Sequence, residues 1–378
     1  MLLSPSSDQE FFRETTARFL AEKSPITEVR RLAEDPVGYD PGWWRQGAEL
    51  GWTSLLIGED HGGGSISGEG LIDLTLVAGE FGKAVAPGPL VGTNLVGATL
   101  SEVGGDRHGD VVAGILDGSM VTAWAYTDKR PHDRLGDVAL TVTVDGDEVV
   151  LDGIKRPVES ASSASHLLVT GTTDGALTQV LVPIDTPGVR LTPMAGVDLT
   201  RRFDEVTFSA VRVPSDAVVG DIGGAAGQVE RQLQRALVIG NAETVGAMQV
   251  GFGITLEYAF DRYSFGRPLA SYQALKHRFA DLKTWLEASH AIADDAARAV
   301  ATDARGAADL ASAAAAYVGD RGGEVLQDCI QLLGGIGMTY EHDIHIYLRR
   351  ATLNAALFGT PAEHRQRLAT LFTEERVA

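Results

Sequence analysis

The chain has 378 residues, of which 44% are hydrophobic and 22% are charged, a composition that excludes disordered and low-complexity proteins. At about 150 residues per domain, this length predicts two to three domains. Acidic residues outnumber basic residues by 51 to 32, and the net charge of −19 argues against nucleic acid or an anionic membrane as a partner. No apolar run approaches the roughly 20 residues of a membrane helix. The single cysteine, Cys329, cannot form an internal disulfide, so we expect a cytoplasmic protein with Cys329 buried as a small apolar side chain.

The spacing of hydrophobic residues divides the chain into three zones. Residues 1–119 have a helical pattern that begins with a predicted capping box between Ser7 and Glu10. Residues 120–220 alternate with a period of two and contain an Asp145-Gly146 turn, which predicts a hairpin in a barrel or sandwich of about seven strands. Residues 221–378 return to a helical pattern. We therefore expect an α+β fold with a helical N-terminal domain, a central antiparallel β domain and a C-terminal four-helix bundle.

Glycine and proline mark the ends of the predicted bundle helices. A helix over residues 228–263 would be roughly 54 Å long, and Gly266-Arg267-Pro268 ends it. Further helices are predicted from about residue 271 to 302, from 307 to 333, from 342 to 357 and after Pro361. The glycine-rich run over residues 58–70 follows no convincing strand and has no Lys-Ser/Thr pair, so a loop between helices is a better interpretation than a phosphate cradle.

Several strings in these zones resemble the acyl-CoA dehydrogenase family. Arg262-Tyr-Ser-Phe-Gly followed by Gln273-Ala-Leu-Lys-His is similar to the R-x-x-F-G and Q-x-x-x-H segment of the family. The string QLLGGIGMTYEHDIHIYLRRA, residues 331–351, is similar to a later family segment, and residues 51–63 and 199–208 also resemble it. The resemblance spans the chain and implies an acyl-CoA dehydrogenase-like fold, FAD as cofactor and oxidation of an acyl-CoA thioester.

The resemblance also implies a set of FAD contacts. In the family, the pyrophosphate and adenine of FAD are held partly by the neighbouring subunit, and those positions map onto Arg262, Phe265, Gln273, Gln331 and Gly335. An arginine can donate two hydrogen bonds to phosphate oxygens, and glycine allows backbone N–H groups to approach closely. In the alternative interpretation, Arg262 is a solvated charge at a helix end and the glycines are helix caps.

The catalytic base expected from the resemblance is missing from its usual place. The family carries a Tyr-Glu-Gly-Thr string after the fourth bundle helix, and the equivalent string here is Leu357-Phe358-Gly359-Thr360, in which Phe358 cannot accept a proton. Some members carry the glutamate on the first long bundle helix, at a position that aligns with Ala236. Glu243 lies seven residues later, two turns along the same face. It lies among Val238, Ile239, Val245 and Met248, so burial would raise its pKa toward a value useful for proton abstraction.

Two interpretations of Glu243 remain open at this point. It is either the base, which also resembles the dehydrogenases of steroid side-chain CoA esters, or a structural carboxylate paired with an Arg or Lys of the next helix. A separate question concerns His342 and His345, which lie one helical turn apart and could act as metal ligands. No supporting pair of ligands is recognisable elsewhere, so we predict no metal.

The β zone departs from the family pattern for holding the flavin ring. The stretch that matches the expected Thr-Glu-Pro string reads Tyr126-Thr127-Asp128-Lys129-Arg130-Pro131 here, and the later strand reads Lys155-Arg156-Pro157-Val158-Glu159-Ser160. Only Thr127 remains as a candidate hydroxyl for the flavin ring, with an ordinary threonine at a strand end as the alternative. The residues that would contact a neighbour's FAD are thus present, whereas most of those that would hold the flavin ring of the chain's own FAD are replaced. The resemblance to heteromeric relatives, in which two unlike subunits complete each other's sites, implies that this chain is one of two unlike subunits.

For the CoA moiety, clustered arginines stand out against the acidic composition. Arg231 and Arg235 are one turn apart on the helix that lines the acyl-CoA cleft in the family, and Arg201 and Arg202 are further candidates. The alternative is that all four are structural or surface charges.

The sequence therefore predicts an acyl-CoA dehydrogenase acting on a bulky or branched, steroid-side-chain type of CoA thioester. It would work with a second dehydrogenase-like subunit, as α2β2, or with a second copy, and with an electron-transfer acceptor. The zones predict domains at 1–119, 120–220 and 221–378. Two alternatives remain: a non-catalytic, cofactor-bridging subunit of such a complex, and a flavin-dependent oxidase or monooxygenase of the same fold.

Overall fold

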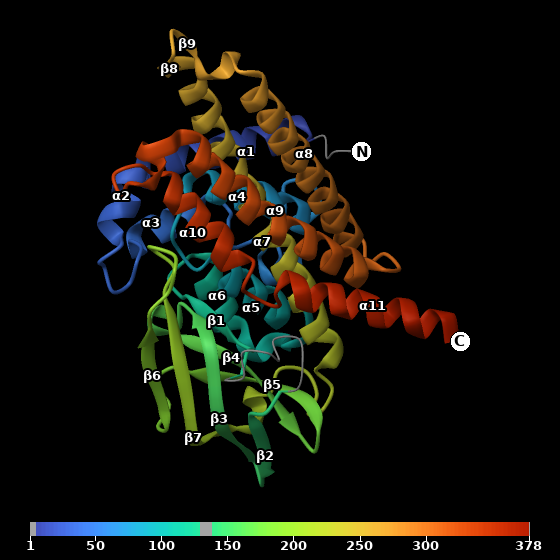
Figure 1. The fold of residues 1–378 in the computed structure, drawn as a ribbon. Helices are drawn as coiled ribbons and strands as arrows, with labels where there is room; N and C mark the ends of the chain where they lie inside the picture. Colours follow the sequence, from blue (N-terminus) through green and yellow to red (C-terminus); the bar gives the residue numbers. More distant parts are fainter. Residues whose placement is uncertain (1–4, 129–137, 378) are drawn as a thin grey trace.

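A computed structural model describes residues 5–128 and 138–377 (Figure 1). The N-terminal part is helical, with α1 Ser7–Lys23, α2 Ile26–Leu32, α3 Pro41–Glu49, η1 Glu59–His61, α4 Gly70–Ala84, α5 Leu90–Val103, η2 Gly105–His108 and α6 Gly109–Leu116. The capping box of α1 is shifted by one residue from the prediction. Ser6 accepts a hydrogen bond from the Gln9 backbone N–H at 3.2 Å, and the Gln9 side chain accepts one from the Ser6 N–H at 2.9 Å. The Ser7–Glu10 box was wrong because Gln9, whose side chain turns toward the protein interior, completes the box instead.

The glycine-rich segment before α4 is a loop, as predicted, and a buried carboxylate organises it. Asp73 is fully buried on α4. It accepts hydrogen bonds from the backbone N–H groups of Ile66 and Ser67 at 2.7 and 3.0 Å and from Gln9 of α1 at 2.7 Å. Because a buried carboxylate requires such donors, this residue ties the loop to α1 and α4.

The central part is a mainly antiparallel sheet at the lower end of the molecule (Figure 1). Its strands are β1 Thr122–Ala125, β2 Thr141–Asp145, β3 Glu148–Glu159, β4 His166–Thr173, β5 Ala176–Pro183, β6 Val189–Met194 and β7 Phe203–Pro214, with η3 Ala161–Ser163 and η4 Ser215–Ala217 between them. The strand order is β1-β4-β2-β3-β7-β6, with β5 beside β4. The hairpin of β2 and β3 across Asp145 and Glu148 confirms the predicted turn. The expectation of only antiparallel pairs was wrong for β4, which runs parallel to β1 and β2.

The C-terminal part consists of long helices. Its elements are α7 Ala226–Asp261, β8 Tyr263–Ser264, β9 Arg267–Pro268, η5 Leu269–Ser271, α8 Gln273–Ala301, α9 Ala307–Leu333, η6 Gly334–Met338, α10 Ile344–Asn354 and α11 Pro361–Val377. Helix α7 packs against α4, α8, α9 and α10, which explains why it is stable over 36 residues. The predicted fold class, with helices at both ends of the chain and a β domain between them, is confirmed. The exact domain limits stay a prediction.

The three parts share one core around α5, β1 and the first half of α7. Helix α5 packs on β1 and on α7, and a single cluster of buried side chains runs from the N-terminal helices through the sheet to α7. This junction lies between the sheet and the helical upper part in Figure 1. Within the described ranges, no helix is both long and apolar enough to span a bilayer.

Candidate active site and cofactor surface

The five residues predicted to contact the nucleotide end of FAD are all exposed, at one end of the C-terminal bundle. Arg262 caps the end of α7, and Phe265 lies in the β8–β9 turn with 97% of its surface exposed. Gln273 is the first residue of α8, Gln331 lies in the last turn of α9, and Gly335 follows it in η6. An ion pair between Arg278 and Asp328 joins the first turns of α8 to the last turns of α9, so the predicted residues on these helices share one end of the bundle.

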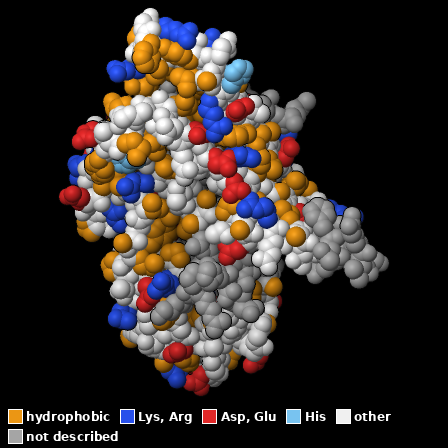
Figure 2. Space-filling view, viewed as in Figure 1, with side chains coloured by type: hydrophobic (Ala, Val, Ile, Leu, Met, Phe, Trp, Pro, Cys, Tyr) orange, Lys and Arg blue, Asp and Glu red, His pale blue; other side chains and the backbone are white. Residues whose placement is uncertain are grey.

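The β8–β9 turn is held in a defined shape although it is exposed. The Tyr272 hydroxyl donates a hydrogen bond to the Ser264 carbonyl at 2.7 Å, and the Arg267 guanidinium stacks 3.9 Å above the Tyr272 ring. Phe265 has a left-handed backbone, with φ of 49°, which aims its ring outward. Figure 2 shows hydrophobic side chains gathered at this end of the molecule. The exposed ones at the end of α7, in the β8–β9 turn and between α9 and α10 are Phe260, Tyr263, Phe265, Ile336, Met338 and Tyr340.

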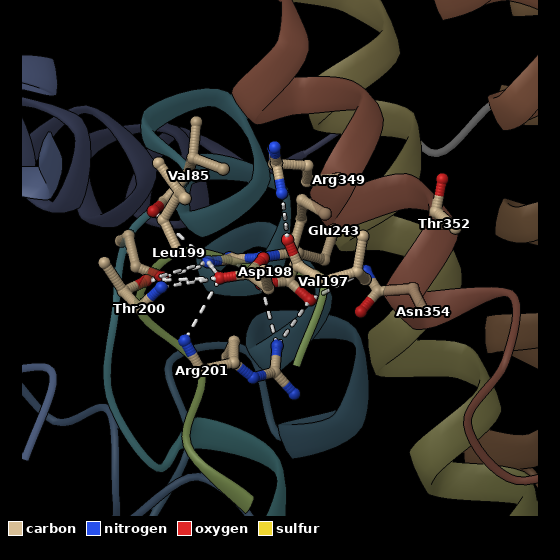
Figure 3. Close-up of polar contacts among 12 residues, drawn as sticks. Val85, Val197, Asp198, Leu199, Thr200, Arg201, Glu243, Arg349, Thr352 and Asn354 are labelled. Atoms are coloured by element: carbon tan, nitrogen blue, oxygen red, sulfur yellow. Dashed lines mark hydrogen bonds and ion pairs between the residues drawn. The ribbon is translucent and has the colours of Figure 1, made fainter. Parts of the chain in front are cut away.

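Glu243, the predicted base, is buried on α7 with 4% of its surface exposed. Its Oε1 accepts a hydrogen bond from Arg350 Nη1 at 2.6 Å. Its Oε2 accepts from Arg201 Nη1 at 3.1 Å and from Asn354 Nδ2 at 2.9 Å. Figure 3 shows Arg201 and Asn354 approaching Glu243 from different elements. Both carboxylate oxygens therefore have charged or amide donors.

These contacts belong to a larger buried cluster, the ionic cluster, formed by Glu159, Asp198, Arg201, Glu243 and Arg350. Arg350 of α10 is fully buried and contacts Asp198 Oδ2 at 2.6 Å. It also donates to the Ala86 carbonyl at 3.0 Å, just after α4. Arg201 forms two hydrogen bonds with Glu159 of β3, one of them at 2.7 Å. The cluster thus joins α7, α10, β3 and the loop between β6 and β7.

The electrostatics of the ionic cluster follow from burial and close charges. Burial raises the pKa of Glu159, although Arg201 opposes this effect. Burial also acts to raise the pKa of Asp198, but the charge and hydrogen bonds of Arg350 outweigh it and lower this pKa to about 2. The carboxylates keep the pKa values of Arg201 and Arg350 above the ordinary value despite burial. Both guanidinium groups and Asp198 are therefore charged at neutral pH.

This geometry matches the structural alternative for Glu243, a carboxylate paired with an arginine of another helix. The expectation that Glu243 is poorly solvated is correct, and Glu243 also lines a small cavity with Ala236, Gly240 and Phe358. Its role as the base stays a prediction.

Thr127 lines a second small cavity on the other side of Phe358, with Trp124, Pro157 and Glu159. The Phe358 ring stacks on Trp124 with 5.5 Å between ring centroids. The structure therefore brings Thr127, Phe358 and Glu243 to one region of the junction. Residues 129–131, the second half of the stretch that matches the Thr-Glu-Pro string, lie outside the described part of the chain.

The arginines proposed for CoA binding already have protein partners. Arg231 and Arg235 of α7 both contact Glu102 of α5, at 3.8 and 2.5 Å. Arg202 donates to the backbone carbonyls of Leu32, Ala33, Asp35 and Leu199 at 2.6–3.0 Å. Arg202 thus holds the end of α2 in place through these hydrogen bonds. The roles of all these arginines in CoA binding stay predictions.

The remaining candidates have local structural contacts. His342 Nδ1 accepts a hydrogen bond from the Ile344 N–H at 3.1 Å, at the start of α10. The His345 ring stacks on Tyr340 with centroids 4.9 Å apart. Over residues 5–128 and 138–377, no group of three His, Cys, Asp or Glu side chains is arranged to hold a metal ion. Cys329 is buried, as expected, and burial raises its thiol pKa to about 11, which makes it a poor nucleophile.

Sequence reasoning missed Asp198, Arg350 and Lys155. For Arg350 there was a signal, because it falls on the same helical stripe as Ile346, Tyr347 and Leu353, all of which are buried. A charged residue in an apolar stripe predicts a buried ionic partner. Asp198 and Lys155 carried no comparable signal.

Comparisons with known proteins agree along the whole chain. Residues 6–108 match the family model of the acyl-CoA dehydrogenase N-terminal domain, and residues 228–371 match that of the C-terminal domain. The chain is 32% identical over 371 residues to "Acyl-CoA dehydrogenase IpdE2" of Mycobacterium tuberculosis, covering 97% of this chain and 98% of that protein. The same-named protein of Mycolicibacterium smegmatis is 31% identical over 96% of this chain and 98% of its own length.

Solved structures give the same result. A variant of the Tcur3481-Tcur3483 steroid ACAD superposes with a TM-score of 0.88 and 26% identity, covering 98% of this chain and 99% of that chain. The ChsE4-ChsE5 complex of Mycobacterium tuberculosis shares the fold at a TM-score of 0.88 and 21% identity, over 99% of each chain. The resemblance carried by the motifs is thereby confirmed, and the chain belongs to the acyl-CoA dehydrogenase family of FAD-dependent oxidoreductases.

Proposed function

We propose that this chain is one subunit of a heteromeric acyl-CoA dehydrogenase, in which it bridges the nucleotide end of an FAD held by an unlike subunit. The substrate of the complex is a bulky or branched CoA thioester of the steroid side-chain type. The observation that carries the proposal is the contrast between two regions. The nucleotide-end residues are exposed, whereas Glu243 is fully engaged by Arg201, Arg350 and Asn354.

The exposed end of the bundle fits the nucleotide part of FAD chemically. Arg262 offers a guanidinium fork for pyrophosphate oxygens, and no atom lies within 4 Å of where a Cβ on Gly335 would stand. Backbone N–H groups beside Gly335 are therefore open to close approach by a phosphate. Phe265 adds an apolar ring with 97% of its surface exposed, suited to contact with the partner chain or the adenine.

Two relatives support the unlike partner and the substrate class. Tcur3481-Tcur3483 is described as a steroid ACAD and its name joins two proteins. ChsE4-ChsE5 is described as a complex. When FAD is bound in the complex, it supplies the acceptor for the β-hydrogen of the thioester. The other subunit supplies the base, because Phe358 has no proton-accepting atom. An electron-transfer protein would reoxidise the flavin.

A second candidate function, catalysis by this chain itself, is favoured by one observation. Glu243 lines a cavity together with Ala236 and Phe358, the two positions at which the family resemblance would place a base. In that case Glu243 would leave its arginine partners in the complex and remove the α-proton of the substrate.

The first experiment tests bridging. The chain is purified alone and after co-expression with an unlike subunit from the same organism, and the FAD-to-protein ratio is measured. We expect flavin only in the complex, and we expect Arg262→Ala to weaken FAD retention about tenfold, the effect of one charge-assisted contact. Arg212→Ala is the matched control, because Arg212 is an exposed arginine of the sheet that pairs with Asp145 and Glu148. Equal flavin retention in both variants would contradict bridging.

The second experiment separates the two roles of Glu243. If Glu243 is the base, Glu243→Gln abolishes turnover by at least about 10³-fold at a temperature where the complex is folded, while flavin content stays near wild type. If it is a member of the ionic cluster, Glu243→Gln and Asp198→Asn both lower the melting temperature, and the complex with Glu243→Gln keeps turnover within about tenfold of wild type at a temperature where it is folded.

A further inference from the structure

The junction between the sheet and the bundle contains two small cavities that share one wall. The cavity beside Glu243 has a volume of about 30 Å³, and the cavity beside Thr127 has a volume of about 20 Å³. Each has room for only one or two water molecules. Val91, Leu357 and Phe358 line both cavities. Of these three, Leu357 and Phe358 follow α10 and separate the candidate ring hydroxyl from the candidate base. We call them the dividing wall.

The Phe358 ring is fixed in this wall by aromatic stacking. It lies nearly parallel to the indole of Trp124, at an interplanar angle of 21°, and Trp124 stacks in turn on Tyr126 at 4.9 Å. The Trp124 indole N–H donates to the Thr170 hydroxyl at 3.2 Å, and the same hydroxyl accepts from Gln179 at 2.9 Å. Stacked pairs of this kind contribute to stability beyond their buried area, so three aromatic side chains fill the space as a unit.

The backbone also directs Phe358 into the junction. Phe358 has a φ of 55°, a left-handed conformation that is an outlier for a bulky side chain. Such a conformation persists only where surrounding contacts hold it. In this case the contact is the stack on Trp124, while Gly359 follows with a φ of 110° and lets the chain turn toward α11.

Beside the wall, the polar side of the Thr127 cavity is taken by a carboxylate. Glu159 lines this cavity and is held there by Arg201. The three-ring isoalloxazine of a flavin would have to displace the Phe358 ring and would also lie against the ionic cluster. The space between Thr127 and Glu243 therefore does not fit a flavin ring in this chain, in contrast to the open nucleotide-end surface.

We propose that Leu357 and Phe358 close this chain's own ring cleft, so that the chain contacts FAD only through its nucleotide-end surface. This inference rests on the proposed bridging function and deepens it. It assigns Phe358 the role of excluding a ring, where sequence reasoning found only the loss of a base. One consequence is that an assembly with the unlike subunit carries one FAD for each pair of chains.

The test uses lumiflavin, which is the flavin ring without the ribityl chain or nucleotide, so that the exposed end of the bundle contributes little to binding. Equilibrium dialysis is carried out with the lone full chain and with three variants: Phe358→Tyr, Phe358→Gly and Leu357→Ala/Phe358→Gly. We expect no measurable binding to wild type or Phe358→Tyr, which keeps the stacked ring. The double variant, which removes the wall and the left-handed constraint, should bind lumiflavin with an affinity at least about tenfold above the detection limit that the wild-type protein does not reach.

Acrylamide quenching of Trp124, isolated by comparison with the same chains carrying Trp124→Phe, reports whether the wall has opened. Stronger quenching with tighter lumiflavin binding supports the proposal. Tight binding of lumiflavin to wild type would overturn it, and so would a folded double variant with an exposed Trp124 and no gain in binding. The Arg262→Ala result is independent of these readouts, so a failure of bridging and a failure of the wall can be told apart.

Discussion

At the scale of single residues, Lys155 carries a clear dependence on pH. It is completely buried in β3, where its ammonium group donates to the Tyr126 carbonyl at 2.8 Å and lies 2.6 Å from Asp128 Oδ1. Burial lowers the pKa of Lys155 to about 8, although Asp128 acts in the opposite direction. The unfolded chain, with a lysine pKa near its ordinary value of 10.5, therefore binds more protons than the folded protein between these two values.

We expect the stability contribution of Lys155 to rise with pH through this window. Relative to Lys155→Met, which does not titrate, the free energy of unfolding of wild type should increase by up to about 3 kcal/mol between pH 8 and 10.5. The contribution is fully present above pH 10.5 and is lost as the pH falls through 8. Urea denaturation of both proteins at several pH values measures it. A constant difference between the two proteins across this range would show that burial does not depress the pKa of Lys155.

At the scale of elements, α10 is the helix whose anchoring depends most on buried charge. Arg350 reaches from it to Asp198, Glu243 and the carbonyls of Val85 and Ala86. Its neighbour Arg349 is partly exposed and donates to the Val197 carbonyl at 2.9 Å. The two arginines therefore allow a controlled comparison on one helix, because Arg350 lies inside the ionic cluster and Arg349 lies outside it.

We expect Arg350→Met to lower the free energy of unfolding by about 3–5 kcal/mol, because it leaves buried carboxylates without their cation. Arg349→Met should cost less than about 1 kcal/mol, as is usual for a partly exposed charge. Chemical denaturation of both variants provides the comparison. Similar losses in the two variants would mean that the ionic cluster does not anchor α10.

The elements themselves were largely predictable because burial imposes a period on the sequence. The long helix α7, the β2–β3 hairpin and the helices that follow are all encoded in the spacing of apolar residues and in glycine or proline at their ends. The two members of the ionic cluster that lie in a loop were not predictable in this way. Arg201 and Asp198 come from the loop between β6 and β7, and no periodic pattern determines where a loop places its side chains.

The candidate site was predictable to a similar, partial extent. The nucleotide-end residues follow from motifs, and the structure places all five on the surface. The loss of the base at Phe358 was also visible in the sequence. That Phe358 forms a wall against Trp124 was not, because the direction of its ring depends on a left-handed backbone that its residue type does not favour.

At the scale of the whole molecule, the exposed apolar end of the bundle should control assembly. Phe265 is 97% exposed and its neighbours Phe260 and Tyr263 are 62% and 64% exposed. Burying such rings against another chain gives a favourable hydrophobic contribution. We expect Phe265→Asp to weaken association with the unlike subunit at least about tenfold.

Val144→Asp is the control for this prediction. Val144 is an exposed apolar residue of β2, at the end of the molecule opposite to β8 and β9 (Figure 1). Analytical ultracentrifugation of each variant with the partner measures the affinity. If both variants assemble as wild type does, or both fail to assemble, the exposed end of the bundle is not the contact surface.

The ionic cluster also limits how this sequence can change during evolution. Three carboxylates, Glu159, Asp198 and Glu243, share two guanidinium groups, Arg201 and Arg350, and removing any one member leaves another poorly compensated away from water. A single replacement is therefore selected against even where a coordinated exchange would be tolerated. Descendants of a common ancestor should inherit these positions as a set or lose them together, so that their co-variation marks the subfamily to which this chain belongs.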